Sequence, residues 1–300
     1  MVLPMTVQTL PLDGPRLYSA PKEMLIDLSV VIPVHNEEDN AVPLYNEVRK
    51  ELDKTGLDWE CIIVDDGSSD RTIERLVEAF AGDARLSVVG LRRNFGQTAG
   101  LAAGFDRARG KFIATMDGDL QNDPADIIKL MDALSEGRGY DVVSGWRKQR
   151  QDKFFSRRMP SMIANRLISK LTWTPIHDFG CAMKVYRREA LQDVQLYGEM
   201  HRFLPALCVW KGARITERVV NHRARVAGTS KYGLVRTGHR DFAEVRMVLR
   251  ERGPPEQQRA RHVLWHDGAA GGSDAGLRRG ERAAGSDLSR GTGQAALRRA

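Results

Sequence analysis

Short apolar runs alternate with amphipathic segments over the first half of the chain. Each run has the length and the continuous apolar character of a strand that is buried on both faces of a sheet. The segments between the runs carry apolar residues at helical spacing, as Tyr45, Val48 and Leu52 do. Strands that alternate with helices predict βαβ units, and therefore a mostly parallel α/β sheet flanked by helices. The expected strands are 28–33, 61–64, 86–91, 111–116 and 140–144, and the expected helices follow at 45–52, 73–80, 97–108 and 125–134.

The pattern becomes less regular after residue 149. Helices are expected at 162–171, which has a broad apolar face, and at 200–211, and further strands at 180–186 and 214–221.

The two ends of the chain differ from this middle part. Residues 1–27 hold several prolines and little periodicity, which predicts an extended, disordered arm. Residues 241–300 are rich in Arg, Gly and Ala and carry few large apolar side chains, which predicts a disordered, low-complexity tail. One α/β domain is therefore expected over residues 28–240.

Polar side chains gather where the predicted strands end. Ligands bind beyond the carboxyl ends of the strands in parallel α/β sheets, so these clusters predict one shared site. They are His35-Asn36-Glu37, Asp65-Asp66, Arg92-Arg93-Asn94, Asp117-Gly118-Asp119 and Trp146-Arg147.

Asp117, Asp119 and Gln121 follow a buried strand and offer oxygen ligands to a hard cation such as Mg²⁺ or Mn²⁺. The alternative interpretation is an ordinary turn, because Gly118 and the sequence at 122–124 also satisfy turn chemistry. The signal favours the metal site over the turn.

The other strand ends are less specific. Asp66 suits a ribose hydroxyl or a base N–H, whereas Asp70 is explained as a helix N-cap. Gly96, Gly100 and Gly104 do not have the spacing of a dinucleotide or phosphate loop. Close packing of a helix on the sheet explains Gly100 and Gly104, and the residues at 94–97 stay candidates for ligand contact.

The net positive charge of the chain indicates an anionic partner. Its 300 residues hold 46 basic and 39 acidic side chains, a net charge of +7. The partner could be nucleic acid, a phosphorylated ligand or an acidic membrane surface. Arg147, Arg223, Arg225 and Lys231 suit phosphate oxygens, although exposed basic residues are more often only solvated. The three cysteines form no CxxC pair and are expected to be reduced thiols.

Seven blocks of sequence together resemble the family 2 glycosyltransferases of the GT-A fold. Within that family they are most similar to the polyprenyl-phosphate glycosyltransferases, the group of dolichol-phosphate mannose synthase and the bactoprenol glucosyltransferases. The resemblance covers residues 28–240. The blocks are VVIPVHNEEDN (30–40), VDDGSSD (64–70), RNFGQTAGL (93–101), MDGDLQNDP (116–124), SGWR (144–147), DFGCAMKVYRRE (178–189) and RVAGTSKYG (225–233).

The resemblance implies a role for each site residue. Asp117, Asp119 and Gln121 form the metal site for Mg²⁺ or Mn²⁺, and Asp178 lies near the acceptor or the sugar. Basic residues hold the donor diphosphate and the acceptor phosphate; these are Arg147, Arg225 and Lys231. The nucleotide sugar is bound by Pro33, His35, Glu37, Val64, Asp66, Asp117, Gly118, Asp119 and Arg147. The family often has Tyr at the position of His35.

The implied reaction is inverting transfer of a sugar from a nucleotide-sugar donor to a polyprenyl phosphate, undecaprenyl or dolichyl. A phosphate nucleophile is already ionised near neutral pH, so no strong general base is needed. Positioning of the substrates and neutralisation of the leaving diphosphate then supply catalysis.

The same resemblance sets expectations about location. Many bacterial relatives continue into transmembrane helices, whereas the tail after about residue 240 has no apolar run of the required length. We therefore expect peripheral attachment to an anionic membrane surface, on the cytoplasmic face of the inner membrane, through the 162–171 face and basic residues.

Three other functions are alternatives to this one. A family 2 enzyme with a non-lipid acceptor in cell-envelope polysaccharide synthesis is the nearest alternative. A haloacid-dehalogenase-type phosphatase also uses a DxD motif, but after its first strand, whereas Asp117 follows the fourth strand here. A nucleic-acid-binding protein is disfavoured because no aromatic platform or reading helix accompanies the basic residues.

Overall fold

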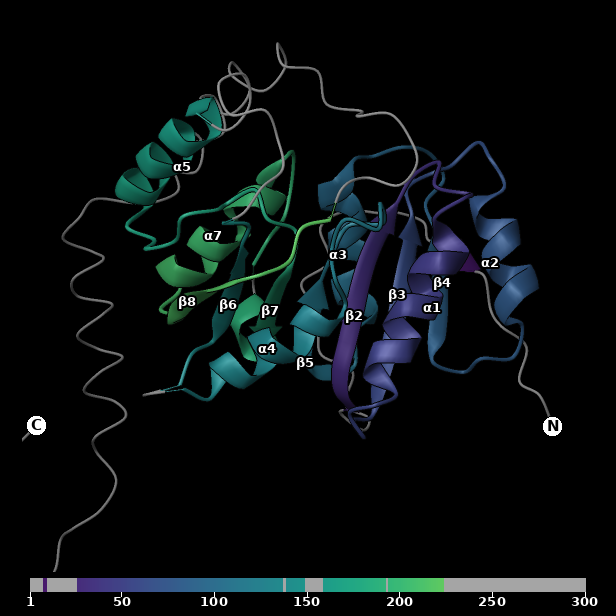
Figure 1. The fold of residues 1–300 in the computed structure, drawn as a ribbon. Helices are drawn as coiled ribbons and strands as arrows, with labels where there is room; N and C mark the ends of the chain where they lie inside the picture. The colour runs from purple at the N-terminus through teal and green to yellow at the C-terminus, as the bar shows by residue number, and fades with distance from the viewer. Residues whose placement is uncertain (1–7, 10–25, 137–138, 149–158, 193, 224–300) are drawn as a thin grey trace, which may run out of the picture.

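A computed structural model of the chain describes residues 8–9, 26–136, 139–148, 159–192 and 194–223. Within them, eight strands form one sheet in the order β1-β4-β3-β2-β5-β7-β6-β8 (Figure 1). The strands are β1 (Gln8–Thr9), β2 (Ile26–Val34), β3 (Trp59–Asp65), β4 (Leu86–Gly90), β5 (Gly110–Thr115), β6 (Val142–Trp146), β7 (Lys184–Arg187) and β8 (Ile215–Val219).

Helices follow most of these strands. They are α1 (Ala41–Leu52), α2 (Thr72–Phe80), α3 (Gln97–Arg107), α4 (Ala125–Leu134), α5 (Met159–Thr172), α6 (Arg188–Leu191), the 3₁₀ helix η2 (Met200–Phe203) and α7 (Leu204–Trp210). The predicted mostly parallel α/β sheet flanked by helices is confirmed, and the five strands and four helices expected before residue 149 are all present.

The second half of the chain departs from the expected pattern at two places. Strand β7 begins at Lys184 rather than at residue 180, and it runs antiparallel to both β5 and β6. The helix expected at 200–211 is divided into η2 and α7, with Pro205 in the first turn of α7. Proline is accommodated in a first turn, where its missing N–H costs no helical hydrogen bond.

Two short parts of the predicted 1–27 arm belong to the sheet. Gln8 and Thr9 pair with Val89 and Gly90 at one edge of the sheet, and Ile26 begins β2. The rest of the 1–27 arm and the whole 241–300 tail lie outside the described residues. No helix in the described part of the chain is long and apolar enough to cross a bilayer.

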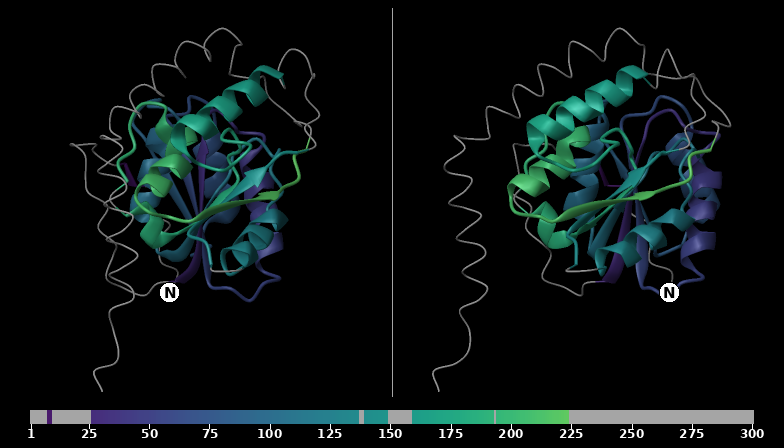
Figure 2. Two further views of the ribbon diagram at one scale, coloured as in Figure 1. Left: turned by 90° about the vertical axis from the view of Figure 1, so that its left-hand side faces the viewer. Right: turned by 60° about the vertical axis from the view of Figure 1, so that its left-hand side comes forward.

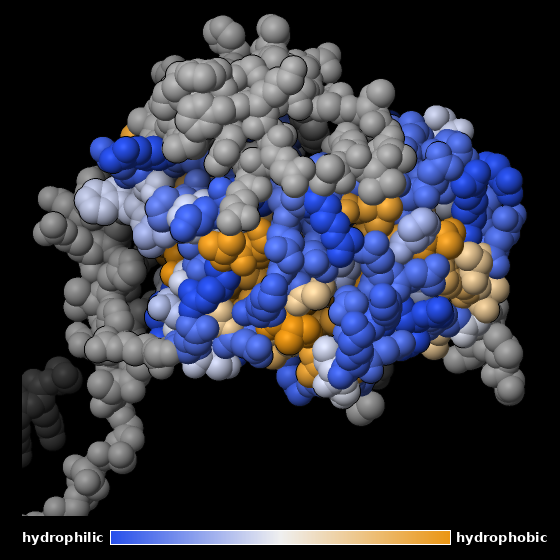
Figure 3. Space-filling model, in the orientation of Figure 1, coloured by the Kyte–Doolittle hydropathy of each residue, from blue (hydrophilic) through white to orange (hydrophobic). Residues whose placement is uncertain are grey.

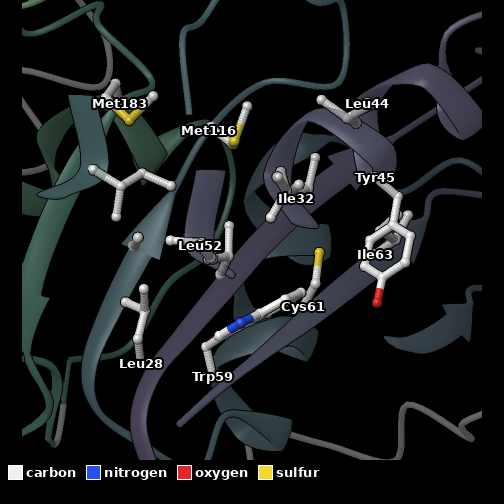
Figure 4. Close-up of a cluster of buried hydrophobic side chains, with 14 of the residues drawn as sticks. Leu28, Ile32, Leu44, Tyr45, Leu52, Trp59, Cys61, Ile63, Met116 and Met183 are labelled. Carbon is white, nitrogen blue, oxygen red and sulfur yellow. The ribbon is translucent and has the colours of Figure 1, made fainter. Parts of the chain in front are cut away.

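Two apolar layers hold the helices on opposite faces of the sheet. Leu28, Val30 and Ile32 of β2 belong to the cluster that buries α1, α2 and α4 (Figure 4). Val31 points the other way and belongs to the cluster that includes α3, α6 and α7. Because successive strand residues face opposite sides, one nine-residue strand supplies side chains to both layers.

The order of the strands determines where a ligand site is expected. Strand β2 lies between β3 and β5, in parallel with both, so the chain leaves the ends of β2 and β5 in opposite directions. Such a point, where the connections diverge, is the usual ligand crevice of an open α/β sheet. Helix α5 lies beyond the same carboxyl end, at the top of Figures 1 and 2.

Gly104 allows α3 to lie close against β2. A Cβ atom at this position would lie 2.2 Å from Cγ1 of Val31. We predict that Gly104→Ala lowers the free energy of unfolding by about 1–3 kcal/mol, because the overlap outweighs the gain of roughly 1 kcal/mol in helix propensity. Chemical denaturation measures this change, and an unchanged or raised stability would show that α3 can move away from the sheet without penalty.

Candidate active site

The loops that follow β2 and β3 are joined by Asn36. Its backbone is left-handed, with φ of 52°, a conformation that Asn adopts more readily than most residues. The backbone N–H of Asn36 donates to Oγ of Ser68 (2.7 Å), and the N–H of Ser69 donates to Oδ1 of Asn36 (2.8 Å). The two strand ends therefore form one rigid wall of the site.

Asp66 fixes the next loop along the chain. Its carboxylate accepts the backbone N–H groups of Phe95 (2.7 Å) and Gly96 (2.8 Å), just before α3. Gly67 has φ of 67°, and a Cβ atom there would lie 2.4 Å from the backbone of Arg93, so only glycine fits. The residue predicted to bind the nucleotide thus also shapes the loop beside it.

Asp117 and Asp119 lie at the end of β5, beside the end of β2. Gly118 packs so closely that a Cβ atom would lie 2.7 Å from Cγ1 of Val34. Oδ1 of Asp117 accepts a hydrogen bond from Nε2 of Gln97 (2.6 Å), which places the start of α3 against this loop. Burial and the neighbouring Asp119 raise the pKa of Asp117 to about 6, although Arg147 and Lys184 act in the opposite direction.

The two carboxylates suit a divalent cation. Their mutual repulsion is the electrostatic condition that a hard cation relieves, and both supply oxygen ligands. In the part of the chain that the structure describes, no third His, Cys, Asp or Glu joins them to form a closed cage. Gln121, the predicted third ligand, donates from Nε2 to the backbone carbonyl of Arg223 (3.1 Å), and its role as a ligand remains a prediction.

The segment after β8 is hydrogen-bonded to the loop that follows β5. The N–H of Arg223 donates to the carbonyl of Gln121 (2.9 Å), and its guanidinium binds Glu47 and Asp123. The N–H of Asn221 donates to Oδ2 of Asp126 (2.6 Å). Arg225 and Lys231, predicted to bind phosphate, follow this segment and lie outside the described residues.

Arg147 and Asp178 form an ion pair beside the carboxylates. Nε of Arg147 lies 2.8 Å from Oδ2 of Asp178, and Nη2 lies 2.9 Å from Oδ1. The two side chains are only 11% and 6% exposed. The pair with Asp178 keeps the pKa of Arg147 raised even though burial lowers it. Asp178, expected near the acceptor or the sugar, therefore holds Arg147 in a fixed orientation.

The other predicted nucleotide residues lie at the same edge of the sheet. Pro33 and Val64 are opposite each other in register, and Val64 is fully buried in the apolar layer against α3. Nε2 of His35 lies 3.4 Å from Nδ2 of Asn36, and Oε2 of Glu37 accepts from Nδ2 of Asn40 (2.6 Å). The structure thus brings together the ends of β2, β3, β5 and β6, as the sequence predicts.

Two features of the site were not predicted from the sequence. Lys184 is buried at the start of β7, where the electrostatic fields of Asp117, Asp178 and Arg147 all reach its ammonium group. His201 of η2 is paired through Nδ1 with Oγ1 of Thr98 in α3 (2.9 Å). A lysine beside an otherwise apolar strand is the one signal that could have identified Lys184.

This fold defines an α/β protein with an acidic pair beside a buried arginine at the carboxyl edge of its sheet. The sequence model of "Glycosyl transferase family 2" matches residues 29–195. The chain belongs to that family, which excludes the phosphatase alternative.

Two curated relatives have names that state their acceptors. The chain is 47% identical over 215 residues to a dodecaprenyl-phosphate galacturonate synthase of Rhizobium johnstonii, covering 71% of this chain and 63% of that protein. It is 39% identical over 209 residues to an undecaprenyl-phosphate 4-deoxy-4-formamido-L-arabinose transferase of Aeromonas hydrophila subsp. hydrophila, covering 69% and 63%. The chain thus spans less than two thirds of the length of these relatives.

Solved structures share the fold. Glucosyl-3-phosphoglycerate synthase of Mycobacterium tuberculosis, in complex with Mn²⁺ and UDP-glucose, superimposes with a TM-score of 0.58 at 20% sequence identity. The match covers 77% of this chain and 80% of that chain. At this identity the likeness concerns the fold, and it confirms the expected GT-A architecture.

The raised pKa of Asp117 has a consequence for stability. A carboxyl with a folded pKa near 6 and an unfolded pKa of 3.8 destabilises the protein as pH rises through this interval. We predict that Asp117→Asn raises the free energy of unfolding by about 1–3 kcal/mol near pH 7, and that the gain disappears near pH 4. Denaturant titrations of both proteins across this range measure the difference; a gain that is independent of pH would contradict the assignment.

Proposed function

We propose that this chain transfers a sugar from a nucleotide-sugar donor to a polyprenyl phosphate, with inversion at the anomeric carbon. The observation that carries the proposal is the pair Asp117 and Asp119 at the point where the connections of the sheet diverge, next to the buried Arg147–Asp178 pair. Both relatives described above act on polyprenyl phosphates by name, which supports the class of acceptor.

The donor lies across the ends of β2, β3 and β5 in this proposal. His35, Glu37 and Asp66, with the backbone at Pro33 and Val64, form the nucleotide side, and Asp117 and Gly118 lie between the nucleotide and the diphosphate. Arg147 faces the diphosphate because Asp178 holds its guanidinium from the other side. Arg225 and Lys231 complete the phosphate contacts.

Asp117 and Asp119, with Gln121, would hold Mg²⁺ or Mn²⁺. The bound cation supplies charge neutralisation for the leaving diphosphate. The solved relative that contains UDP-glucose also contains Mn²⁺, which supports a divalent metal without deciding between the two ions.

The chemistry needs no strong base. An oxygen of the acceptor phosphate attacks the anomeric carbon, a C–O bond forms, and the bond from that carbon to the nucleoside diphosphate breaks. The acceptor phosphate has no proton to lose from the attacking oxygen at neutral pH. The protein's own residues therefore act by orientation and by stabilising the negative charge that develops on the diphosphate.

A transfer assay tests this proposal. The full chain is incubated with Mn²⁺, radiolabelled UDP-galacturonate or UDP-glucose, and undecaprenyl or dodecaprenyl phosphate in detergent, and lipid-linked sugar is extracted. Asp119→Asn is expected to lower the rate by at least ~10²-fold, the scale of losing one preorganised charge. Asp132→Asn, an exposed carboxylate on α4, is the matched control and keeps wild-type activity.

Other outcomes of that assay decide against the proposal. Transfer to a water-soluble acceptor such as 3-phosphoglycerate, with no lipid product, would favour the non-lipid alternative. Full activity of Asp119→Asn, or of the wild type in EDTA, would exclude the metal site.

The structure changes which face of α5 is proposed to meet the membrane. Ile168 and Leu171, from the predicted apolar face, pack against the buried cluster of Met200 and Phe203. Arg166 and Lys170 are exposed instead, and their spacing places them on one face of the helix, while Trp173, which is also exposed, directly follows the last helical residue. Trp173 is 77% exposed. Hydrophilic residues cover most of the described surface on the side of the molecule seen in Figure 3, with apolar patches between them. We propose that this basic and aromatic face contacts an anionic lipid surface, on the cytoplasmic side of the inner membrane.

Flotation with anionic vesicles tests the lipid contact. Trp173→Asn removes the ring but keeps a residue suited to the local φ of 55°. We expect its binding to phosphatidylglycerol vesicles to be roughly tenfold weaker, because an aromatic ring no longer enters the interface. Val219→Asn, which alters another exposed apolar residue, is the control and binds like the wild type. Equal binding by all three proteins, or binding that high salt leaves unchanged, would contradict the proposal.

A further inference from the structure

Lys184 occupies a central position that the proposed mechanism does not use. It opens β7, the antiparallel strand between β5 and β6, and it lies opposite Thr115 and Ser144 in register. Thr115 precedes Asp117 by two residues, and Ser144 precedes Arg147 by three. The lysine therefore lies between the two strands that present the acidic pair and the arginine.

The ammonium group of Lys184 binds the turn that carries Asp178. Nζ donates to the backbone carbonyl of Cys181 and lies 3.5 Å from the carbonyl of Phe179. These two carbonyls lie on either side of Gly180, where a Cβ atom would lie 3.2 Å from Nη2 of Arg147. The turn thus passes closely beneath the guanidinium, and Lys184 holds it there.

Packing alone does not account for a charge at this position. The residue is only 4% exposed, and burial of an ammonium group is costly unless the site compensates it. Burial lowers the pKa of Lys184, whereas Asp178 and Asp117 favour its charged form. A methionine of similar volume would fill the same space without this cost, so the charge itself needs an explanation.

We propose that Lys184 is a positioning residue, which acts through Asp178 to fix the orientation of Arg147. Its ammonium group immobilises the 178–181 turn, the turn sets the carboxylate of Asp178, and the carboxylate aims the guanidinium toward the donor diphosphate. This inference deepens the proposed function and rests on it for its catalytic consequence, but its structural step can be measured without any substrate.

The test compares two buried cations that both bind backbone carbonyls. Lys184→Met removes the one beneath the site. Arg188→Met removes a cation that is 2% exposed and donates to the carbonyls of Gly110 (2.8 Å) and Ala108 (2.7 Å), at the opposite end of β5. Both variants leave buried backbone carbonyls without their hydrogen-bond donor, so both are expected to lower thermal stability. Only Lys184→Met is expected to loosen the orientation of the Arg147 guanidinium.

Two measurements are made on each variant. The NMR signal of the Arg147 Nε–H is assigned as the one that Arg147→Lys lacks. We expect hydrogen exchange of this N–H to be at least tenfold faster in Lys184→Met and unchanged in Arg188→Met. In the transfer assay, Lys184→Met is expected to lower kcat by ~10–100-fold with a smaller change in KM, because the lost interaction acts mainly in the transition state. Arg188→Met keeps the kcat of the folded enzyme.

The outcomes separate this inference from the proposed function. Absence of transfer by the wild type would refute the proposed function, while exchange at Arg147 would still decide the role of Lys184. Unchanged exchange at Arg147 in Lys184→Met would overturn the inference. If Lys184→Met does not fold, Lys184→Gln replaces it; failure of both, with a folded Arg188→Met, would assign Lys184 to overall stability and also overturn it.

Discussion

Because β2 pairs in parallel with β3 on one side and β5 on the other, the chain leaves the carboxyl end of the sheet in two directions at one point. The acidic residues and the loops after β2 and β3 depend on this pairing. The loop after β2 meets the loop after β3 through Asn36, and the loop after β5 rests on Val34 through Gly118. A change in register by one residue would turn the side chains at these strand ends to the opposite face.

Electrostatic interactions also restrict which charged side chains can lie at this edge of the sheet. Asp117 and Asp119 repel each other in a partly buried position. Two later strands bring a cation near them: Arg147 follows β6, and Lys184 is the first residue of β7. Removal of one partner from a buried pair such as Arg147–Asp178 leaves an uncompensated charge and costs about 3–5 kcal/mol. The cations are therefore constrained in position as strictly as the carboxylates.

Sequence pattern was sufficient for the parts of the molecule in which one strand and one helix alternate. The continuous apolar runs gave β2, β3 and β5, and the polar residues that follow them gave most of the site. The pattern was insufficient where contacts join distant segments. Nothing local to Lys184 distinguishes an antiparallel strand between β5 and β6 from another parallel one, and nothing local to Asp178 shows that Arg147 is its partner. Ile168 and Leu171 have the spacing of a surface-binding face, but η2 and α7 cover them.

The chain thus assembles the site from two parts with different physical origins. The acidic residues and those proposed to face the nucleotide lie at the ends of β2, β3 and β5, where strands and helices alternate and local pattern determines the structure. The buried cation, Arg147, follows β6; its partner Asp178 lies in the turn before β7, and Lys184 is the first residue of β7, which runs antiparallel to β5 and β6. Since β7 contributes backbone hydrogen bonds to both β5 and β6, its insertion joins the acidic part of the site to the basic part. A substitution that loosens β7 should therefore separate Arg147 from Asp117 while the wall formed by the ends of β2 and β3 stays intact.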